Sequence, residues 1–149
     1  RSPSIWPRAT SRSKFPPATL VAQGAYTLWQ SGEGIPQALL IASGSELSLA
    51  MTAGAELAKE NLNVRVVSMP SWELFERQTK KIRNAVLPPR CKLRVAIEAG
   101  SPMGWERYVG AKGRVIGINH FGASGPYGVL AREFGFTPEH VVQTVKDML

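Results

Sequence analysis

The chain has 149 residues with 44% hydrophobic and 19% charged residues, and its net charge is +7. This composition is ordinary for one soluble globular domain, and the lack of any long apolar run or signal-peptide pattern excludes a membrane span and favours no membrane partner. The single cysteine, Cys91, excludes an internal disulfide and suits a reducing, cytoplasmic location.

The positive charge is concentrated at the start of the chain. Arg1, Arg8, Arg12 and Lys14 precede the first acidic residue, Glu33, so that the remaining 14 basic and 11 acidic residues leave an excess of only +3. Aromatic and basic residues do not alternate in the manner of surfaces that stack bases. We therefore expect no nucleic-acid partner.

The first 20 residues differ from the rest. They contain four prolines with Ser and Arg between them and no apolar periodicity, which predicts an extended or disordered basic arm over residues 1–20 and a folded domain over 21–149. Because residue 1 is Arg1 and not Met, we expect a processed or truncated piece.

Short strands and helices alternate along the predicted domain. The strand-like segments are, in chain order, residues 25–30, 38–42, 64–69, 93–98 and 115–118. Helical spacing is found over residues 47–58, 71–75, 82–87, 105–109, 129–134 and 138–149. Ser45 and Thr137 are expected as N-caps of two of these helices. The uninterrupted apolar run 38–42 (ALLIA) is typical of a strand buried on both faces.

This alternation predicts an α/β sandwich with a mainly parallel sheet and right-handed crossovers. In such sheets ligands bind at the carboxyl ends of the strands. The small and polar residues that follow those ends are candidates for binding an anion such as phosphate: Gly44, Ser45, Ser71, Ser101, His120 and Ser124. The same residue types also form tight turns and helix N-caps, and a histidine such as His120 is often simply packed, so both interpretations stay open.

Other polar and aromatic residues give weaker signals. Trp105 and Tyr108 are candidates for an interface, although their helical spacing equally fits the core. Glu98 is expected to form hydrogen bonds, His140 to lie on the surface, and Cys91 to be structural because it lacks a partner at metal-ligand spacing. The sequence therefore predicts no catalytic residue and no metal site.

Four stretches together resemble one family. They are LIASGSELSL (40–49), VRVVSMPSWELF (64–75), AIEAGSPMGWERY (96–108) and IGINHFGASGP (116–126). In order and spacing they resemble the C-terminal domain of transketolase, and the match runs from about Phe15 to Leu149. The close relative dihydroxyacetone synthase remains an alternative.

The resemblance implies a three-layer domain with about five strands, of which one is antiparallel. It also implies a parent enzyme of three domains that acts as a homodimer in the pentose phosphate pathway and transfers a two-carbon ketol unit between sugar phosphates. That parent uses thiamine diphosphate and a divalent metal such as Mg or Ca, held by its first two domains. The third domain, matched here, contributes to subunit packing and has been suggested to hold a regulatory or ligand-binding cleft.

The chain lacks the GDG…N motif with which such enzymes bind their metal, and Asp147 is its only aspartate. Hard divalent cations require oxygen ligands, so we expect no cofactor and no ketol transfer from this chain alone. Its expected partners are the other transketolase domains, and a second copy of the chain. Two alternatives remain: a free-standing module that binds a small anion or nucleotide at the strand ends, and a protein-interaction module.

Overall fold

The structure is a computed structural model that describes residues 18–100, 102–117 and 136–149. The predicted arm up to residue 17, the candidates Ser101, His120 and Ser124, and the helix expected over 129–134 lie outside the described residues. Residues 18–20 begin a short 3-10 helix, η1 (Ala18–Gln23). The boundary near residue 20 stays a prediction.

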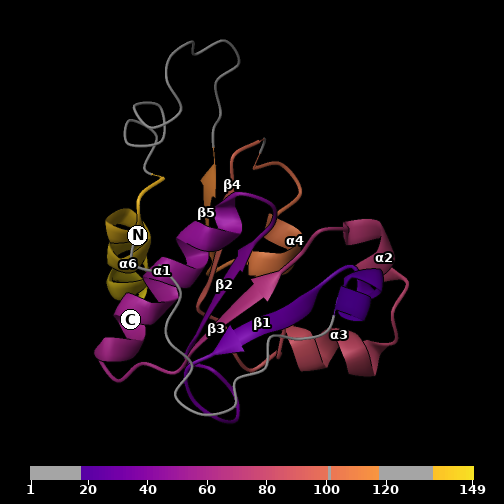
Figure 1. The fold of residues 1–149 in the computed structure, drawn as a ribbon, viewed down its shortest axis with the longest axis horizontal. Coiled ribbons are helices and arrows are strands. Elements are labelled where there is room, and N and C mark those ends of the chain that lie inside the picture. Colours follow the sequence, from indigo (N-terminus) through magenta and orange to yellow (C-terminus); the bar gives the residue numbers. More distant parts are fainter. Residues whose placement is uncertain (1–17, 101, 118–135) are drawn as a thin grey trace, which may run out of the picture.

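The five described strands form one sheet. They are β1 (Tyr26–Gln30), β2 (Ala38–Ala42), β3 (Val64–Ser68), β4 (Arg94–Glu98) and β5 (Arg114–Gly117). Their order is β1-β3-β2-β4-β5 (Figure 1). β3, β2, β4 and β5 are parallel neighbours, and β1 pairs with β3 in the antiparallel direction. The predicted mainly parallel sheet with one antiparallel strand is confirmed.

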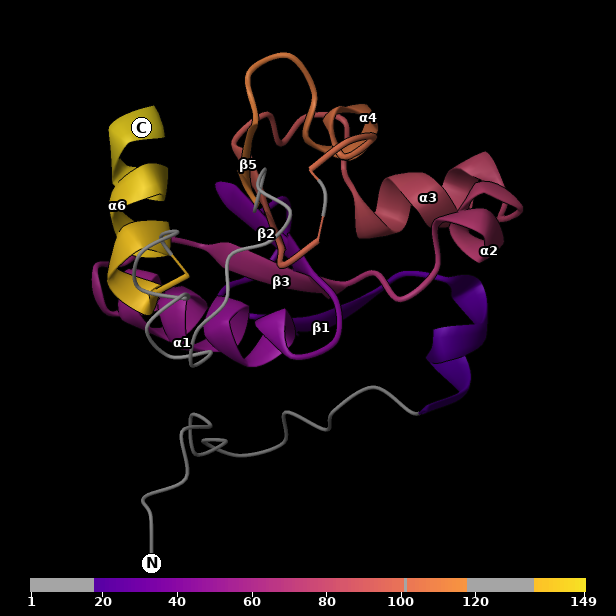
Figure 2. The same ribbon diagram turned by 90° about the horizontal axis from the view of Figure 1, so that it is seen from above.

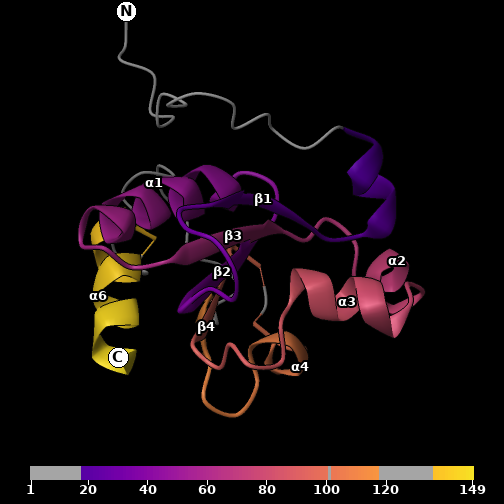
Figure 3. The ribbon, with the colours of Figure 1, turned by 90° about the horizontal axis from the view of Figure 1, so that it is seen from below.

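Helices cover both faces of this sheet. The described α-helices are α1 (Glu46–Lys59), α2 (Trp72–Glu76), α3 (Lys80–Val86), α4 (Glu106–Val109) and α6 (Pro138–Met148). Figure 2 and Figure 3 show α1 on one side of the sheet and α2, α3 and α4 on the other. α6 packs against α1, which completes the predicted three layers. None of the described helices is long and apolar enough to cross a bilayer.

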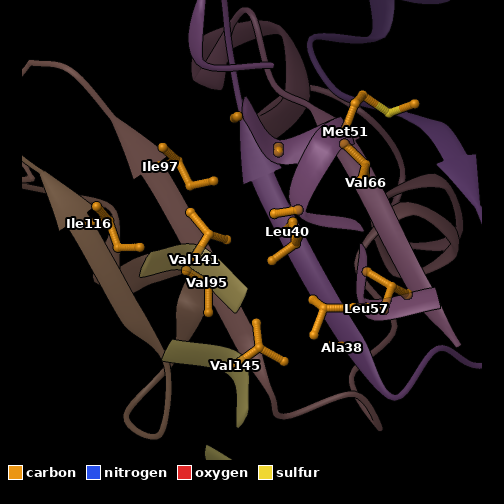
Figure 4. Close-up of a cluster of buried hydrophobic side chains, with 14 of the residues drawn as sticks. Ala38, Leu40, Met51, Leu57, Val66, Val95, Ile97, Ile116, Val141 and Val145 are labelled. Carbon is orange, nitrogen blue, oxygen red and sulfur yellow. The ribbon is translucent and has the colours of Figure 1, made fainter. Parts of the chain in front are cut away.

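β2 is the central strand, and all five of its residues are fully buried. Because side chains alternate along a strand, Ala38, Leu40 and Ala42 face a core beneath α1 and α6 (Figure 4). Leu39 and Ile41 face a second core beneath α2, α3 and α4. The prediction that residues 38–42 are buried on both faces is confirmed.

The ends of α1 and α6 agree only in part with the local features expected from the sequence. The hydroxyl of Thr137 accepts a hydrogen bond from the His140 N–H and caps α6 as predicted. Ser45 occupies the N-cap position of α1, but its backbone is helical and its side chain makes no capping hydrogen bond. The helix predicted over 138–149 ends one residue earlier, at Met148, and Leu149 is 66% exposed.

Gly24 provides a sharp test of the packing between η1, β1 and α2. Gly24 and Gly34 both have a positive φ, of 81° and 73°. A Cβ on Gly24 would collide with the Phe75 nitrogen and the Ser71 carbonyl oxygen, whereas a Cβ on Gly34 would meet nothing within 4 Å. Both substitutions by Ala carry the backbone strain of about 1–2 kcal/mol. Gly24→Ala should cost about 1–3 kcal/mol more because of the collision.

Chemical denaturation of the wild type, Gly24→Ala and Gly34→Ala checks this expectation. Equal losses of unfolding free energy in the two variants would contradict the close approach of η1 and α2.

Candidate functional site

The strand order creates a switch point between β2 and β4. The chain leaves β2 through α1 on one face of the sheet and leaves β4 through α4 on the other face. The two loops therefore diverge at the carboxyl ends of neighbouring parallel strands, which is where ligands bind in open α/β sheets. Residues 43–45, 99–100 and 102–104 form the described part of this crevice.

The two described serine hydroxyls that were predicted to bind an anion each form a hydrogen bond within the fold. Gly44 lies in the turn between β2 and α1 and has a φ of 57°. The Ser45 hydroxyl donates a hydrogen bond to the Glu46 carboxylate over 2.9 Å. The Ser71 hydroxyl accepts one from the Leu74 N–H and caps α2. The structural role of Ser71, left open by the sequence, is therefore present in the fold.

Two carboxylates follow the same strand ends. Glu46 is 6% exposed at the start of α1. Glu98 ends β4 and accepts a hydrogen bond from the Gly100 N–H over 2.9 Å. Negative charge on Glu46 and Glu98 would oppose the binding of an anion close to either carboxylate. Anion binding by Gly44, Ser45, Ser71, Ser101, His120 and Ser124 stays a prediction.

The described residues do not fit a thiamine diphosphate and metal site. They contain no group of three or more His, Cys, Asp or Glu that could hold a metal ion. The only aspartate, Asp147, accepts a hydrogen bond from Gln143 one turn away, near the C-terminus. A hard divalent cation bridging to a diphosphate needs several convergent oxygen ligands, so we derive no catalytic step through such a group here.

A cavity of about 620 Å³ lies at the opposite end of the strands, between α2, α3 and α4. Arg94 at the start of β4 and Lys112 shortly before β5 place it near the amino ends of these strands. Its lining contains five cationic side chains and one carboxylate: Arg83, Lys92, Arg94, Arg107, Lys112 and Glu76. We call this hollow the basic pocket.

Glu76 sits among donors in the basic pocket. The Tyr108 hydroxyl donates a hydrogen bond to Glu76 Oε1 over 2.9 Å. The guanidinium groups of Arg83 and Arg107 lie 3.6 and 3.9 Å from the same carboxylate. Burial, and next the hydrogen bond to Glu76, raise the pKa of Tyr108 to about 12. Tyr108 is therefore a neutral donor at physiological pH.

Arg94 holds one wall of the basic pocket in place. Its guanidinium donates hydrogen bonds to the carbonyl oxygens of Leu87, Pro88, Cys91 and Tyr108. Burial lowers the pKa of Arg94, but an arginine remains protonated in proteins. This side chain therefore ties the loop after α3 to the end of α4 and adds a fixed positive charge behind the pocket.

The two predicted interface residues pack inside the domain. Trp105 and Tyr108 are 2% and 3% exposed. Both rings contact Trp72, with centroid distances of 5.0 and 5.5 Å, in the range of favourable aromatic pairs. The structure thus gives them the core position that the sequence left open, and a contact of either residue with another subunit stays a prediction.

Sequence reasoning missed the cations of the basic pocket. They come from α3, α4, β4 and two loops and have no regular spacing, so no motif joins them. The segment RCKLR over residues 90–94 was the one local signal. Its meaning depends on α4, which brings Arg107 to the same hollow.

Comparison with known proteins gives a consistent match. The family model for the transketolase-like TK C-terminal domain matches residues 24–137. The chain is 49% identical over 129 residues to a transketolase of Geobacillus stearothermophilus and 47% identical over 154 aligned positions to the chloroplastic transketolase of Spinacia oleracea. It covers only 19% and 20% of these relatives, while 87% and 99% of the chain itself is matched.

A solved structure agrees with the sequence matches. The fold is similar to part of transketolase from Leishmania mexicana, with a TM-score of 0.79 and 43% identity. The match covers 87% of this chain and 18% of that one. The chain thus spans about one fifth of the length of the transketolases it matches.

The raised pKa of Tyr108 predicts a change of stability at alkaline pH. The folded state holds the phenol proton up to a pKa of about 12, whereas the unfolded value is about 10. The contribution of this proton is therefore complete below pH 10 and is lost as the pH rises from 10 to 12. The free energy of unfolding of the wild type should fall more steeply in this range than that of Tyr108→Phe.

Denaturation curves of the two proteins between pH 8 and pH 12 measure the difference. Absorbance of the phenolate gives an independent readout, because the titration near pH 12 should disappear in Tyr108→Phe. Parallel stability curves, or an unchanged phenolate titration, would show that burial and the hydrogen bond to Glu76 do not hold the proton on Tyr108.

Proposed function

The chain belongs to the transketolase family as a transketolase-like C-terminal domain, and from this premise we propose that it acts as a non-catalytic packing domain of a transketolase. The observation that carries the proposal is the extent of the matches. They cover most of this chain but only about 19% of the relatives. The remaining four fifths of such an enzyme are available to supply the chemistry.

The proposed division of labour follows from the donor groups. In the parent enzyme, thiamine diphosphate with a divalent metal supplies the carbanion chemistry that moves a two-carbon ketol unit between sugar phosphates. We propose that other domains hold both groups, because the described residues of this chain offer no convergent set of oxygen ligands. A homodimeric, cytoplasmic parent enzyme in the pentose phosphate pathway completes the proposal.

Exposed apolar side chains support a packing role. Val21 on η1 and Leu74 on α2 are 43% and 37% exposed, and η1 and α2 contact each other. Apolar surface of this kind gains free energy when a neighbouring domain covers it. We propose that this η1/α2 end docks against another transketolase domain.

The first test is activity of the pure chain. We expect no measurable ketol transfer with thiamine diphosphate and magnesium, and no rise of the melting temperature when both are added. Any group that binds only the folded state at 100 times its dissociation constant would add about 2.7 kcal/mol of stability. A full-length transketolase serves as the positive control.

The chain should be produced in a host without its own transketolase, so that contamination cannot supply the signal. Ketol transfer that co-purifies with the chain, or a thermal shift with thiamine diphosphate, would overturn the proposed division of labour.

The second test is association with the rest of the enzyme. A transketolase that lacks its C-terminal domain, made from the Geobacillus stearothermophilus relative, should bind this chain in native mass spectrometry. Leu74→Ser should weaken the complex because a hydroxyl replaces buried apolar area. Leu149→Ser, which changes another exposed leucine on the far side of the sheet, is the matched control and should bind as the wild type does.

Equal weakening by both variants would show that the docking surface is not the η1/α2 end. Binding that neither variant affects would also place the interface elsewhere.

A further inference from the structure

We propose that the basic pocket is a binding site for a small phosphorylated molecule, a role separate from the packing function above. Five cations and one carboxylate line it, so its formal charge is +5 − 1 = +4. Every lining residue belongs to the described part of the chain. This local excess exceeds the +3 that residues 15–149 carry in total, so positive charge is concentrated here.

The arginines retain capacity for an incoming oxygen. Arg83 and Arg107 share a single carboxylate, that of Glu76, at 3.6 and 3.9 Å. These separations are too long for good hydrogen bonds. Arg83 Nε is also buried without a hydrogen-bond partner among the described residues. Unpaired buried donors are rare in folded proteins, so the hydrogen-bonding capacity of this guanidinium is not filled by the described residues.

Phosphate oxygens fit these donors. A guanidinium donates two parallel hydrogen bonds to a phosphate, and such charge-assisted bonds are the strong ones. Glu76, held by Tyr108, keeps the two guanidinium groups near each other without neutralising both. The exposed Lys92 and Lys112 at the edge of the pocket add attraction for an approaching anion.

The shape favours a small molecule over a polymer. A volume of about 620 Å³ lies within the range of roughly 300–1,000 Å³ that is usual for small-molecule sites. Phe75, Leu87 and Val109 give it apolar walls, against which the carbon skeleton of a phosphorylated metabolite can pack. A nucleic acid would instead need an extended groove that follows many phosphates.

The framework of the pocket is formed before any ligand arrives. Arg94 fastens the loop after α3 to the end of α4 through four carbonyl oxygens. The rings of Phe75 and Tyr108 lie 6.1 Å apart between α2 and α4. Binding therefore does not have to order these segments, which reduces its entropic cost.

Isothermal titration of the 149-residue chain tests the proposal, with circular dichroism confirming that each sample is folded. The probes are inorganic phosphate, pyrophosphate, glucose 6-phosphate and AMP, and glucose is the uncharged control. We expect one phosphorylated molecule per chain, no binding of glucose, and weaker binding at higher salt. Comparing glucose 6-phosphate, AMP and the inorganic probes shows whether the sugar, the base or the phosphate alone is recognised.

Three variants locate the site. Arg107→Gln, whose side chain is largely exposed, and Arg83→Gln should each weaken binding about tenfold or more, since each removes charge-assisted hydrogen bonds. Arg77→Gln is the matched control. Arg77 lies directly after α2, close in sequence to Glu76, but it pairs with Glu73 and does not line the pocket. Its replacement should therefore leave the affinity unchanged within about twofold.

Three results would overturn the proposal. The first is no saturable binding of any phosphorylated probe by the folded chain. The second is equal loss in Arg77→Gln and in the two pocket variants, which would indicate non-specific charge attraction. The third is tighter binding of an octaglutamate peptide than of every phosphorylated probe, which would identify the pocket as a docking point for an acidic segment. None of these results depends on ketol transfer or on docking, so the packing proposal is tested separately.

Discussion

The complete burial of β2 is the constraint on which the rest of the structure depends. Its residues pair with β3 on one side and with β4 on the other, so its backbone hydrogen bonds are satisfied within the sheet. Its side chains are apolar on both faces and supply both cores. Neither face of the sheet can therefore be left to water, and helices must cover both. The crossovers then set α1 and α6 against α2, α3 and α4.

Two arginines join the layers on the α2–α4 side. Arg65 leaves β3 and donates to the carbonyl oxygens of Ala85 and Val86 at the end of α3, where a cation also complements the helix dipole. Arg94 leaves β4 and donates to the carbonyl oxygens of Pro88, in the loop after α3, and of Tyr108 in α4. Burial lowers the pKa of both. Two carbonyl partners for Arg65 and four for Arg94 offset the cost of removing these charges from water. The basic pocket forms between the segments that Arg94 holds together.

The sequence predicted the features that depend on local pattern. The run of five apolar residues identified β2, and the alternation of strands and helices gave the layers, because each follows from side-chain period. The N-cap of α6 was predicted for the same reason, since Thr137 precedes Pro138 directly. Ser45 differs because its backbone is already helical, with a φ of −66° and a ψ of −26°, whereas a capping serine usually has an extended backbone.

The candidate sites were less predictable because they depend on tertiary contacts. Gly44, Ser45 and Ser71 were placed correctly after strand ends, but the electrostatics of the crevice depend on Glu46 and Glu98, which adjacent strands bring to the same edge. The basic pocket was missed for the complementary reason. Its cations are separated by up to 29 positions, from Arg83 to Lys112. Two acids lie between them along the chain, Glu98 and Glu106, and neither lines the pocket, so local charge counts do not reveal the cluster.

The two proposed roles can coexist because α2 presents different residues in different directions. Successive residues on a helix are turned by about 100°. Phe75 is buried in the core, Glu76 lines the basic pocket, and Leu74 is exposed to solvent. A domain that docks on Leu74 therefore approaches α2 from a direction different from that of an anion that reaches Arg83 and Arg107. The short helix α2 nevertheless connects the two surfaces, so a shift of α2 on docking would move Glu76 relative to both arginines.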